Sequence, residues 1–377
     1  MSTIVVDATG LDSGHRTRGI GRYVQGLVQG LAELVPPGGP LRIELLRLAD
    51  RKAGGEAPAF REVEFARRTA KDAFWMFLEN RVRLGELLRG RADLYHATGM
   101  EGVVTGLPWV ATCHDLIPLD LRGPYLRPWD LEAQVFWRAY VHRLRHGPRR
   151  IIAISQFVRQ RLIEAYGVPA QNVDVVYHGV APFWHEPAGA PSQAVQAVAE
   201  RPFLLFVGGF DARKNMAGTL EALSSMDPRV RPRLVVAGAR TPVIKRRHNR
   251  LLRRHPVDVT FLEYVDDEAL RWLYSRAVAL AFPSTAEGWG FPIVEAMAAG
   301  CPVICAGFGS MVESGGGAAH TVDIHSPRAI AQAVAELSAS VSLQSERRAA
   351  GRERAATLTW RACAEGVLET YSAALRG

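Results

Sequence analysis

Short apolar runs rich in β-branched residues alternate along this chain with segments whose apolar residues recur at helical spacing. Six such runs occupy the first half, at residues 4–7, 41–48, 94–97, 109–114, 150–154 and 173–177. Five more follow in the second half, at residues 203–207, 233–237, 259–262, 278–282 and 303–306. Strands that alternate with helices form βαβ units and parallel sheets. The pattern therefore predicts an α/β protein with two doubly wound, Rossmann-like domains.

The boundary between the two series lies near residue 190. Residues 181–193 are rich in Pro, Gly and Ala and lack periodicity, which predicts a linker. We therefore expect an N-terminal domain at 1–185 and a C-terminal domain at 186–359. The last helix, 360–377, lies beyond the final β/α unit and is expected to pack back on the N-terminal domain. Ligands of open α/β sheets bind at the carboxyl ends of the strands, so the two domains are expected to face each other across a ligand-binding cleft.

The strongest chemical signal is the segment from Pro283 to Gly300, PSTAEGWGFPIVEAMAAG. A strand enters a glycine-containing loop, a proline opens a helix, and Gly300 follows the end of that helix. Such a helix start presents unpaired backbone N–H groups that suit a phosphate. Glu287 in the loop and Glu295 inside the helix can accept hydrogen bonds from sugar or ribose hydroxyls. The residues expected to bind a nucleotide here are Gly288, Gly290, Phe291, Pro292 and Glu295.

A second signal, FVGGFDARKN, starts at Phe206. The paired glycines Gly208 and Gly209 let the backbone approach a ligand closely. Arg213 and Lys214 then supply two cations, which would stabilise the negative charge that grows on a departing diphosphate. A solvated turn is the alternative for this pair taken alone.

Two features of the N-terminal domain add to this picture. Gly19 and Gly21 follow the first strand after a polar loop, but no third glycine stands three residues on, which disfavours a nicotinamide site. His114 ends a strand at the predicted ligand-binding edge, with Asp115 beside it as an orienting or acceptor-binding neighbour. A purely structural histidine is the alternative.

Composition narrows the class further. No apolar run approaches the roughly 20 residues of a membrane-spanning helix, and the N-terminus shows no signal peptide. The four cysteines form no CxxC pair, which favours a reducing, cytoplasmic setting. The net charge of +8 is concentrated at residues 142–146 and 245–254. These basic runs are either solvated helix faces or surfaces for an anionic membrane or a phosphorylated acceptor, and no nucleic-acid-binding signature accompanies them. Residues 74–78, FWMFL, lie either in a core helix or in a membrane-surface helix.

These motifs together resemble the retaining glycosyltransferases of family 4, also called glycosyl transferases group 1, which have the GT-B fold. Glu287 and Glu295, with seven residues between them, match the two-glutamate motif of that family. The Arg-Lys-Asn turn resembles a subgroup rich in mannosyltransferases of surface-polysaccharide assembly. Many members place an arginine directly after the first glycine, where this chain has Gly209. The resemblance covers nearly the whole chain and is weaker across residues 50–90.

The resemblance implies a catalytic set and a reaction. Arg213 and Lys214 hold the diphosphate, Glu295 holds the ribose, and Glu287 with His114 contacts the transferred sugar, while the glycine loop at Gly19 and Gly21 lies near the diphosphate and acceptor. It implies transfer with retention from a nucleotide-diphosphate sugar, with GDP-mannose as first guess, to a hydroxyl of a glycan, lipid-linked or small-molecule acceptor.

Neither a metal nor another cofactor is expected, and the chain has no Asp-x-Asp motif. A cytoplasmic enzyme in peripheral contact with the membrane fits this assignment. The alternatives are a catalytically silent, membrane-associated binding subunit of GT-B fold, or a nucleotide-sugar epimerase or phosphorylase on the same fold. A pyridoxal phosphorylase is disfavoured because no lysine stands at a matching position.

Overall fold

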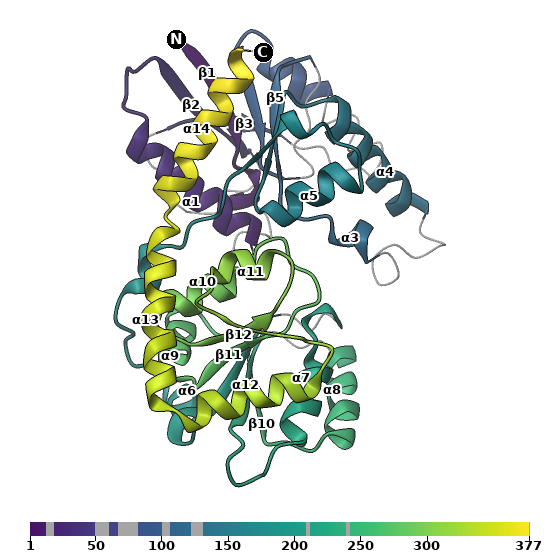
Figure 1. The fold of residues 1–377 in the computed structure, drawn as a ribbon. Coiled ribbons are helices and arrows are strands. Elements are labelled where there is room, and N and C mark those ends of the chain that lie inside the picture. Colours follow the sequence, from purple (N-terminus) through teal and green to yellow (C-terminus); the bar gives the residue numbers. More distant parts are fainter. Residues whose placement is uncertain are drawn as a thin grey trace. The chain divides into compact units, whose positions relative to one another are not determined.

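The computed structural model describes residues 1–12, 19–49, 60–66, 82–99, 106–121, 131–208, 212–238 and 242–376. The chain divides into two compact units (Figure 1). Unit 1 comprises Met1–Gly179 and Leu358–Gly377, and unit 2 comprises Val180–Thr357. The division falls at residue 180, a few residues before the boundary expected from composition.

Unit 1 is built on a parallel sheet of seven described strands in the order β3-β2-β1-β4-β5-β6-β7. These strands are β1 (Ser2–Asp7), β2 (Leu41–Leu48), β3 (Arg61–Phe65), β4 (Leu94–Ala97), β5 (Trp109–Cys113), β6 (Arg150–Ala153) and β7 (Val173–Val175). Its described helices include η1 (Thr9–Asp12), α1 (Gly19–Leu34), α3 (Ile117–Asp120), α4 (Leu131–His146), α5 (Gln156–Glu164), η2 (Ala170–Asn172) and α14 (Trp360–Arg376), and residues 82–88 are helical as well.

Unit 2 contains a parallel sheet of six described strands in the order β10-β9-β8-β11-β12-β13. They are β8 (Phe203–Val207), β9 (Arg233–Ala237), β10 (Val259–Glu263), β11 (Ala279–Phe282), β12 (Val303–Ala306) and β13 (His320–Val322). The described helices are η3 (Pro182–His185), α6 (Gln193–Gln196), η4 (Ala197–Glu200), η5 (Ala212–Lys214), α7 (Met216–Ser224), α8 (Pro242–Arg254), α9 (Asp267–Arg276), α10 (Phe291–Ala298), α11 (Ser310–Gly315), α12 (Pro327–Ala339) and α13 (Val341–Thr357).

The strand order of unit 2 reverses between β8 and β11. The chain runs outward from β8 through β9 to β10 and then returns to pair β11 with β8. Right-handed crossovers in opposite directions put α7 and α8 on one face of the sheet and α9 and α10 on the other (Figure 1). The carboxyl ends of β8 and β11 thus form the switch point where ligands of such sheets bind.

Central strands and edge strands differ in how clearly the sequence marks them. Ile4, Val5 and Val6 in β1 are all fully buried, as expected for a parallel strand covered on both faces. The predicted α/β class with two doubly wound parallel sheets is confirmed. Edge strands β3 and β13 were missed, because β3 alternates exposed charged residues with buried Val63 and Phe65 and β13 is three residues long.

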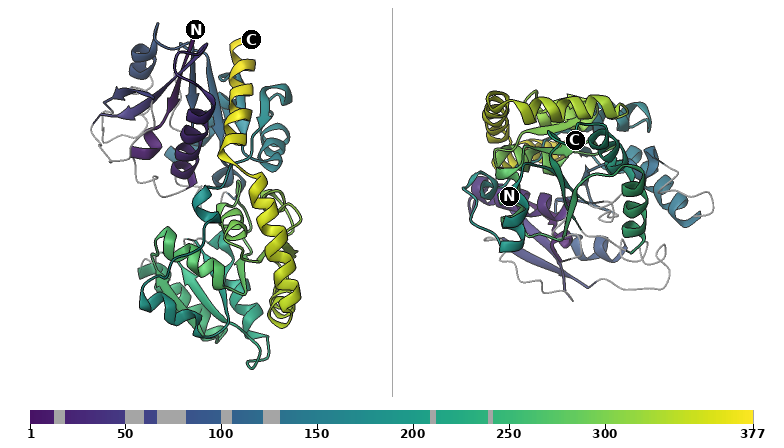
Figure 2. Two further views of the ribbon diagram at one scale, coloured as in Figure 1. Left: turned by 90° about the vertical axis from the view of Figure 1, so that its left-hand side faces the viewer. Right: turned by 90° about the horizontal axis from the view of Figure 1, so that it is seen from below.

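Helix α14 packs along α1 within unit 1, and both views show the two helices side by side (Figures 1 and 2). Two glycines of α1 allow this approach. A Cβ atom built on Gly26 would lie 2.0 Å from the Trp360 ring, and one on Gly30 would lie 2.3 Å from the Trp360 carbonyl oxygen. The buried face of α14 includes Val367 and Tyr371.

The segment predicted as a linker is partly packed on unit 2. Residues 182–185 form η3, where Trp184 is buried with its ring 5.9 Å from that of Tyr274. The guanidinium of Arg271 lies over the Phe183 ring at 4.0 Å and donates to the Phe183 carbonyl. Aromatic anchors therefore fix a stretch whose small residues and prolines suggested only a connection.

Candidate functional site

The carboxyl end of β8 comes unusually close to that of β9. Gly208 and Gly238 follow the two strands with φ of +129° and +155°, a region that favours glycine. A Cβ on Gly238 would lie 2.4 Å from the Gly208 carbonyl oxygen. The close approach therefore requires glycine at position 238, and the positive φ of Gly208 favours glycine there as well. Gly209 lies outside the described residues.

Backbone contacts join the Arg-Lys turn to the two-glutamate loop. The Thr285 N–H donates to the Arg213 carbonyl oxygen at 2.7 Å, and the Arg213 guanidinium donates to the Ala286 carbonyl oxygen at 2.9 Å. Asn215 then begins α7 with φ of +55°, and its side chain accepts from the Gly218 N–H at 3.1 Å. This close joining holds the turn after β8 and the loop after β11 in one fixed arrangement at the switch point.

Arg213, Lys214 and Glu287 meet at a single atom. The Arg213 Nη1 and the Lys214 Nζ each lie 2.6 Å from Glu287 Oε1. The Lys214 ammonium also lies 4.3 Å from the centre of the Phe282 ring. Burial would raise the pKa of Glu287, but Lys214 and Arg213 outweigh it and lower that pKa below its ordinary value. The glutamate is therefore an anion that neutralises part of a cationic centre.

The helix that follows the loop places the second glutamate in the core of unit 2. Gly290, with φ of +105°, precedes α10, which has no side-chain cap, and the Ile293 N–H in the first turn donates to the Gly290 carbonyl oxygen at 2.9 Å. Gly288 is buried, Phe291 and Pro292 are half-buried in the first turn, and Glu295 is only 4% exposed. A further support comes from Ser310, whose hydroxyl donates to the Glu287 carbonyl oxygen at 2.7 Å.

In unit 1, His114 follows β5 with one ring nitrogen already engaged. Its Nε2 lies 2.7 Å from the Thr98 carbonyl oxygen. Because a carbonyl can only accept, Nε2 carries the proton and Nδ1 is left as an acceptor. Burial lowers the pKa of His114 to about 4, against a smaller opposing effect of this hydrogen bond. The imidazole is therefore neutral at physiological pH. The Asp115 carboxylate accepts from the N–H of Ile117, the first residue of α3, at 3.0 Å.

The glycines of the N-terminal motif are helical. Gly19 and Gly21 lie in the first turn of α1, so the loop predicted at these two positions is wrong. Further along the same helix, Tyr23 is buried, its hydroxyl 2.9 Å from that of Thr112 and its ring 5.0 Å from the His114 ring. This aromatic side chain packs the start of α1 against β5 and His114.

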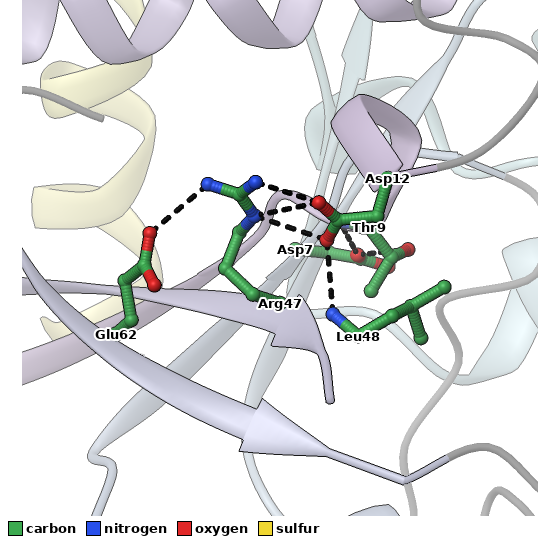
Figure 3. A network of polar contacts seen from close by, with 6 residues as sticks. All are labelled: Asp7, Thr9, Asp12, Arg47, Leu48 and Glu62. Atoms are coloured by element: carbon green, nitrogen blue, oxygen red, sulfur yellow. Dashed lines mark hydrogen bonds and ion pairs between the residues drawn. The ribbon is translucent and has the colours of Figure 1, made fainter. Parts of the chain in front are cut away.

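A buried ion pair, missed by the sequence analysis, anchors the segment before α1 (Figure 3). The Arg47 guanidinium donates from Nε and Nη2 to the Asp12 carboxylate, with a shortest distance of 2.6 Å, and from Nη1 to Glu62. Asp12 also accepts from the Leu48 N–H at 2.9 Å. The Asp7 carboxylate accepts from the hydroxyl of Thr9, the first residue of η1, at 2.6 Å. No sequence motif marks these residues, because 35 positions separate Asp12 from Arg47.

The remaining predictions fall outside this geometry. The aromatic segment 74–78 lies outside the described residues. Within the described basic helix α8, His248 is buried and stacks on Phe261 at 5.3 Å, while Arg250 and Arg254 are exposed. In the described part of the chain, no helix combines the length and apolar character needed to cross a membrane.

Comparisons with known proteins bear on both units. The sequence profile of "Glycosyl transferases group 1" matches residues 191–354, and that of "Glycosyltransferase Family 4" matches residues 17–182. The chain is 28% identical over 239 residues to O-antigen chain mannosyltransferase B of Escherichia coli, covering 61% of this chain and 62% of that protein. It is 27% identical over 205 residues to O-antigen chain mannosyltransferase RfbU of Salmonella typhimurium, covering 52% and 55%. The match thus spans less than two thirds of either relative.

Solved structures resemble the chain over nearly its whole length. Anabaena Alr3699/HepE, in complex with UDP and glucose, superposes with a TM-score of 0.74 at 17% identity, covering 99% of each chain. The sucrose-phosphate synthase of Thermosynechococcus elongatus superposes with a TM-score of 0.73 at 20% identity, covering 99% and 98%. At such identities the likeness concerns the fold alone, and it confirms the GT-B fold.

Proposed function

The chain belongs to the glycosyltransferases of family 4, the glycosyl transferases group 1, and from that premise we propose that it transfers a sugar from a nucleotide-diphosphate sugar to an acceptor hydroxyl with retention of configuration. The observation that carries this proposal is the convergence of Arg213, Lys214 and Glu287 at the switch point of unit 2. Two cations there can stabilise a diphosphate. A nearby carboxylate can accept hydrogen bonds from sugar hydroxyls.

The roles proposed for unit 2 follow the chemistry of each group. Arg213 and Lys214 hold the diphosphate, and the loop that leads into α10, with Gly288 and Gly290, contacts the nucleotide. Glu295 accepts from the ribose hydroxyls, and Glu287 accepts from the transferred sugar. Gly208 permits close backbone approach. We propose that these cations take the place of a divalent ion, so that transfer needs no metal.

For unit 1 we propose that His114 recognises a hydroxyl of the transferred sugar. Its free nitrogen, Nδ1, can only accept a hydrogen bond when Nε2–H is donated to Thr98. A neutral acceptor suits a hydroxyl and disfavours a carboxylate or phosphate at this point. Gly19 and Gly21, in the first turn of α1, would lie near the diphosphate and acceptor, as the family resemblance implies.

In the reaction that we propose, the leaving diphosphate takes both the bonding electrons and the proton of the acceptor hydroxyl. The acceptor oxygen attacks the anomeric carbon from the face that the phosphate is leaving. The bond between that carbon and the phosphate oxygen breaks, the bond to the acceptor oxygen forms, and the acceptor proton passes to the leaving phosphate. Arg213 and Lys214 stabilise the charge that develops on the phosphate, which is where such groups lower the barrier most.

The donor is proposed to be GDP-mannose. Both Escherichia coli and Salmonella relatives are named as mannosyltransferases of O-antigen chains, whereas solved structures such as Alr3699/HepE contain UDP. A glycan or lipid-linked acceptor would fit those relatives, and the basic helix α8 would fit peripheral contact with an anionic membrane in the cytoplasm. The four described thiols are free, which agrees with a reducing compartment.

Thermal unfolding in the presence of GDP, UDP, dTDP and their sugars tests the proposal. A ligand that binds only the folded state raises the midpoint, by an amount that grows with its concentration relative to Kd. GDP and GDP-mannose are expected to give the largest shift. A GDP-mannose hydrolysis assay on the same sample separates an enzyme from a silent binding subunit. Absence of any shift and of any hydrolysis across the panel would refute the proposed activity.

A further inference from the structure

Glu287 occupies the position where an anionic ligand would meet the two cations. The Arg213 Nη1 and the Lys214 Nζ both lie 2.6 Å from one of its oxygens, Oε1. The side chains of Glu287 and Lys214 are each only 11% exposed, so water screens this contact weakly. Two positive charges thus share one negative charge in a poorly solvated place.

The backbone around this cluster is held by contacts that do not involve the Glu287 carboxylate. The Ser310 hydroxyl donates to the Glu287 carbonyl oxygen. The Thr285 N–H donates to the Arg213 carbonyl oxygen. The backbone at Arg213 and at Glu287 therefore stays in place if the Glu287 carboxylate turns away from the cations. Rotation of the Glu287 side chain is then enough to expose the two cations.

A diphosphate bound by both cations must replace or share the contact with Oε1. At separations near 4 Å, like charges at a protein surface repel by about 4 kcal/mol with an effective dielectric constant of 20. A carboxylate already on the cations therefore weakens the binding of a second anion. We infer that Glu287 regulates this site as an internal anion, competing with the diphosphate of the donor and of the released nucleotide for Arg213 and Lys214. This inference rests on the function proposed above.

The competition favours turnover. As the bond to the sugar breaks, negative charge grows on the phosphate, and the cations shift from Glu287 towards it when stabilisation is most useful. Once the sugar has moved to the acceptor, Glu287 returns to the cations and helps to expel the nucleoside diphosphate. The same residue thereby limits product inhibition.

Isothermal titration with inorganic pyrophosphate, GDP and UDP tests the inference. The variants are Glu287→Gln, Glu287→Asp and, as a matched control in the same motif, Glu295→Gln. We expect Glu287→Gln to bind pyrophosphate at least about tenfold more tightly than the wild type, because the competing charge is gone. Glu287→Asp keeps that charge and should bind pyrophosphate like the wild type. Glu295→Gln should leave pyrophosphate binding unchanged and weaken only the nucleotides.

Pyrophosphate affinity that is equal or weaker in Glu287→Gln than in the wild type, in protein with an unchanged circular dichroism spectrum, overturns the inference. Equal tightening in Glu287→Asp would also overturn it, because loss of charge would then not be the cause. Lys214→Met separates this failure from that of the proposed function. If Lys214→Met weakens pyrophosphate binding but Glu287→Gln does not strengthen it, only the competition is wrong. If neither substitution changes binding, the proposed diphosphate site itself is wrong.

Discussion

The Tyr371 hydroxyl lies 2.6 Å from Nδ1 of His96, although 275 residues separate them in the chain. The other ring nitrogen of His96 lies 2.7 Å from the Thr112 hydroxyl, which in turn lies 2.9 Å from the Tyr23 hydroxyl. All four side chains are buried. This chain of hydrogen bonds ties α14 and α1 to the centre of the unit 1 sheet, next to His114.

The buried histidines of unit 1 should make it sensitive to acid. Burial, with a smaller effect of the nearby His114, lowers the pKa of His96 to about 3. The folded state therefore binds fewer protons than the unfolded state below the model-peptide value of 6.5, so stability is complete above that pH and is lost as the pH falls towards 3. Between pH 7 and pH 5 the loss for His96 is about 2 kcal/mol.

Urea unfolding of wild type and His96→Gln at the two pH values checks this. The substitution should lower stability at pH 7 and reduce the difference between the two pH values by about 2 kcal/mol. Tyr371→Phe removes one hydrogen bond but keeps His96, so it should lower the free energy of unfolding by about 1 kcal/mol at both pH values. An unchanged pH difference in His96→Gln would contradict the prediction.

Gly30→Ala should loosen the contact between α1 and α14. Alanine favours a helix by about 1 kcal/mol over glycine, but its Cβ would lie 2.3 Å from the Trp360 carbonyl oxygen and 2.9 Å from the Ala364 Cβ. The Trp360 carbonyl belongs to the backbone of α14 and cannot turn aside as a side chain can. We therefore expect Gly30→Ala to lower the free energy of unfolding by about 1–3 kcal/mol. Urea unfolding and the rate of proteolytic release of residues 358–377 measure it. Gly189→Ala, which meets nothing within 4 Å, is the control; equal stability of the two variants would argue against the tight contact.

Lys214→Met should lower kcat by about 100- to 1,000-fold, because one of the charges proposed to stabilise the leaving diphosphate is lost. Initial rates with GDP-mannose and a suitable acceptor measure this. Lys245→Met is the matched control, since Lys245 is paired with exposed Glu263 at 2.8 Å and lies on α8. Its rate should equal that of the wild type. A rate near normal for Lys214→Met would remove Lys214 from the proposed mechanism.

Arg47→Met should destabilise unit 1 by about 3–5 kcal/mol, because it leaves the buried Asp12 carboxylate without a compensating positive charge. The double variant Asp12→Asn with Arg47→Met removes both charges and should recover most of that loss, since the amide oxygen can still accept from the Leu48 N–H. Equilibrium unfolding in urea gives both values. Arg229→Met, which breaks the exposed pair with Asp227, should cause no measurable change. A double variant as unstable as Arg47→Met would mean that packing of the Arg47 side chain, and not charge, is responsible.

Local pattern was sufficient for the central strands and for the main motifs. Residues such as Ile4–Val6 form a continuous apolar run because a parallel strand is buried on both faces, and such a run is visible in the sequence. The glycines and proline around α10 likewise have local conformational causes. The resemblance of Glu287 and Glu295 to a family motif then identified the family from the chain alone.

Partners distant in the chain were decided by the tertiary structure. Sequence placed Lys214 and Glu287 in the same ligand-binding region, but the shared oxygen atom appears only when β8 and β11 become neighbours across 73 residues. The Asp12–Arg47 pair and the Tyr371–His96 bond have no local signal. Backbone conformation and burial pattern are properties of neighbouring residues, whereas electrostatic pairing depends on which strands the fold makes adjacent.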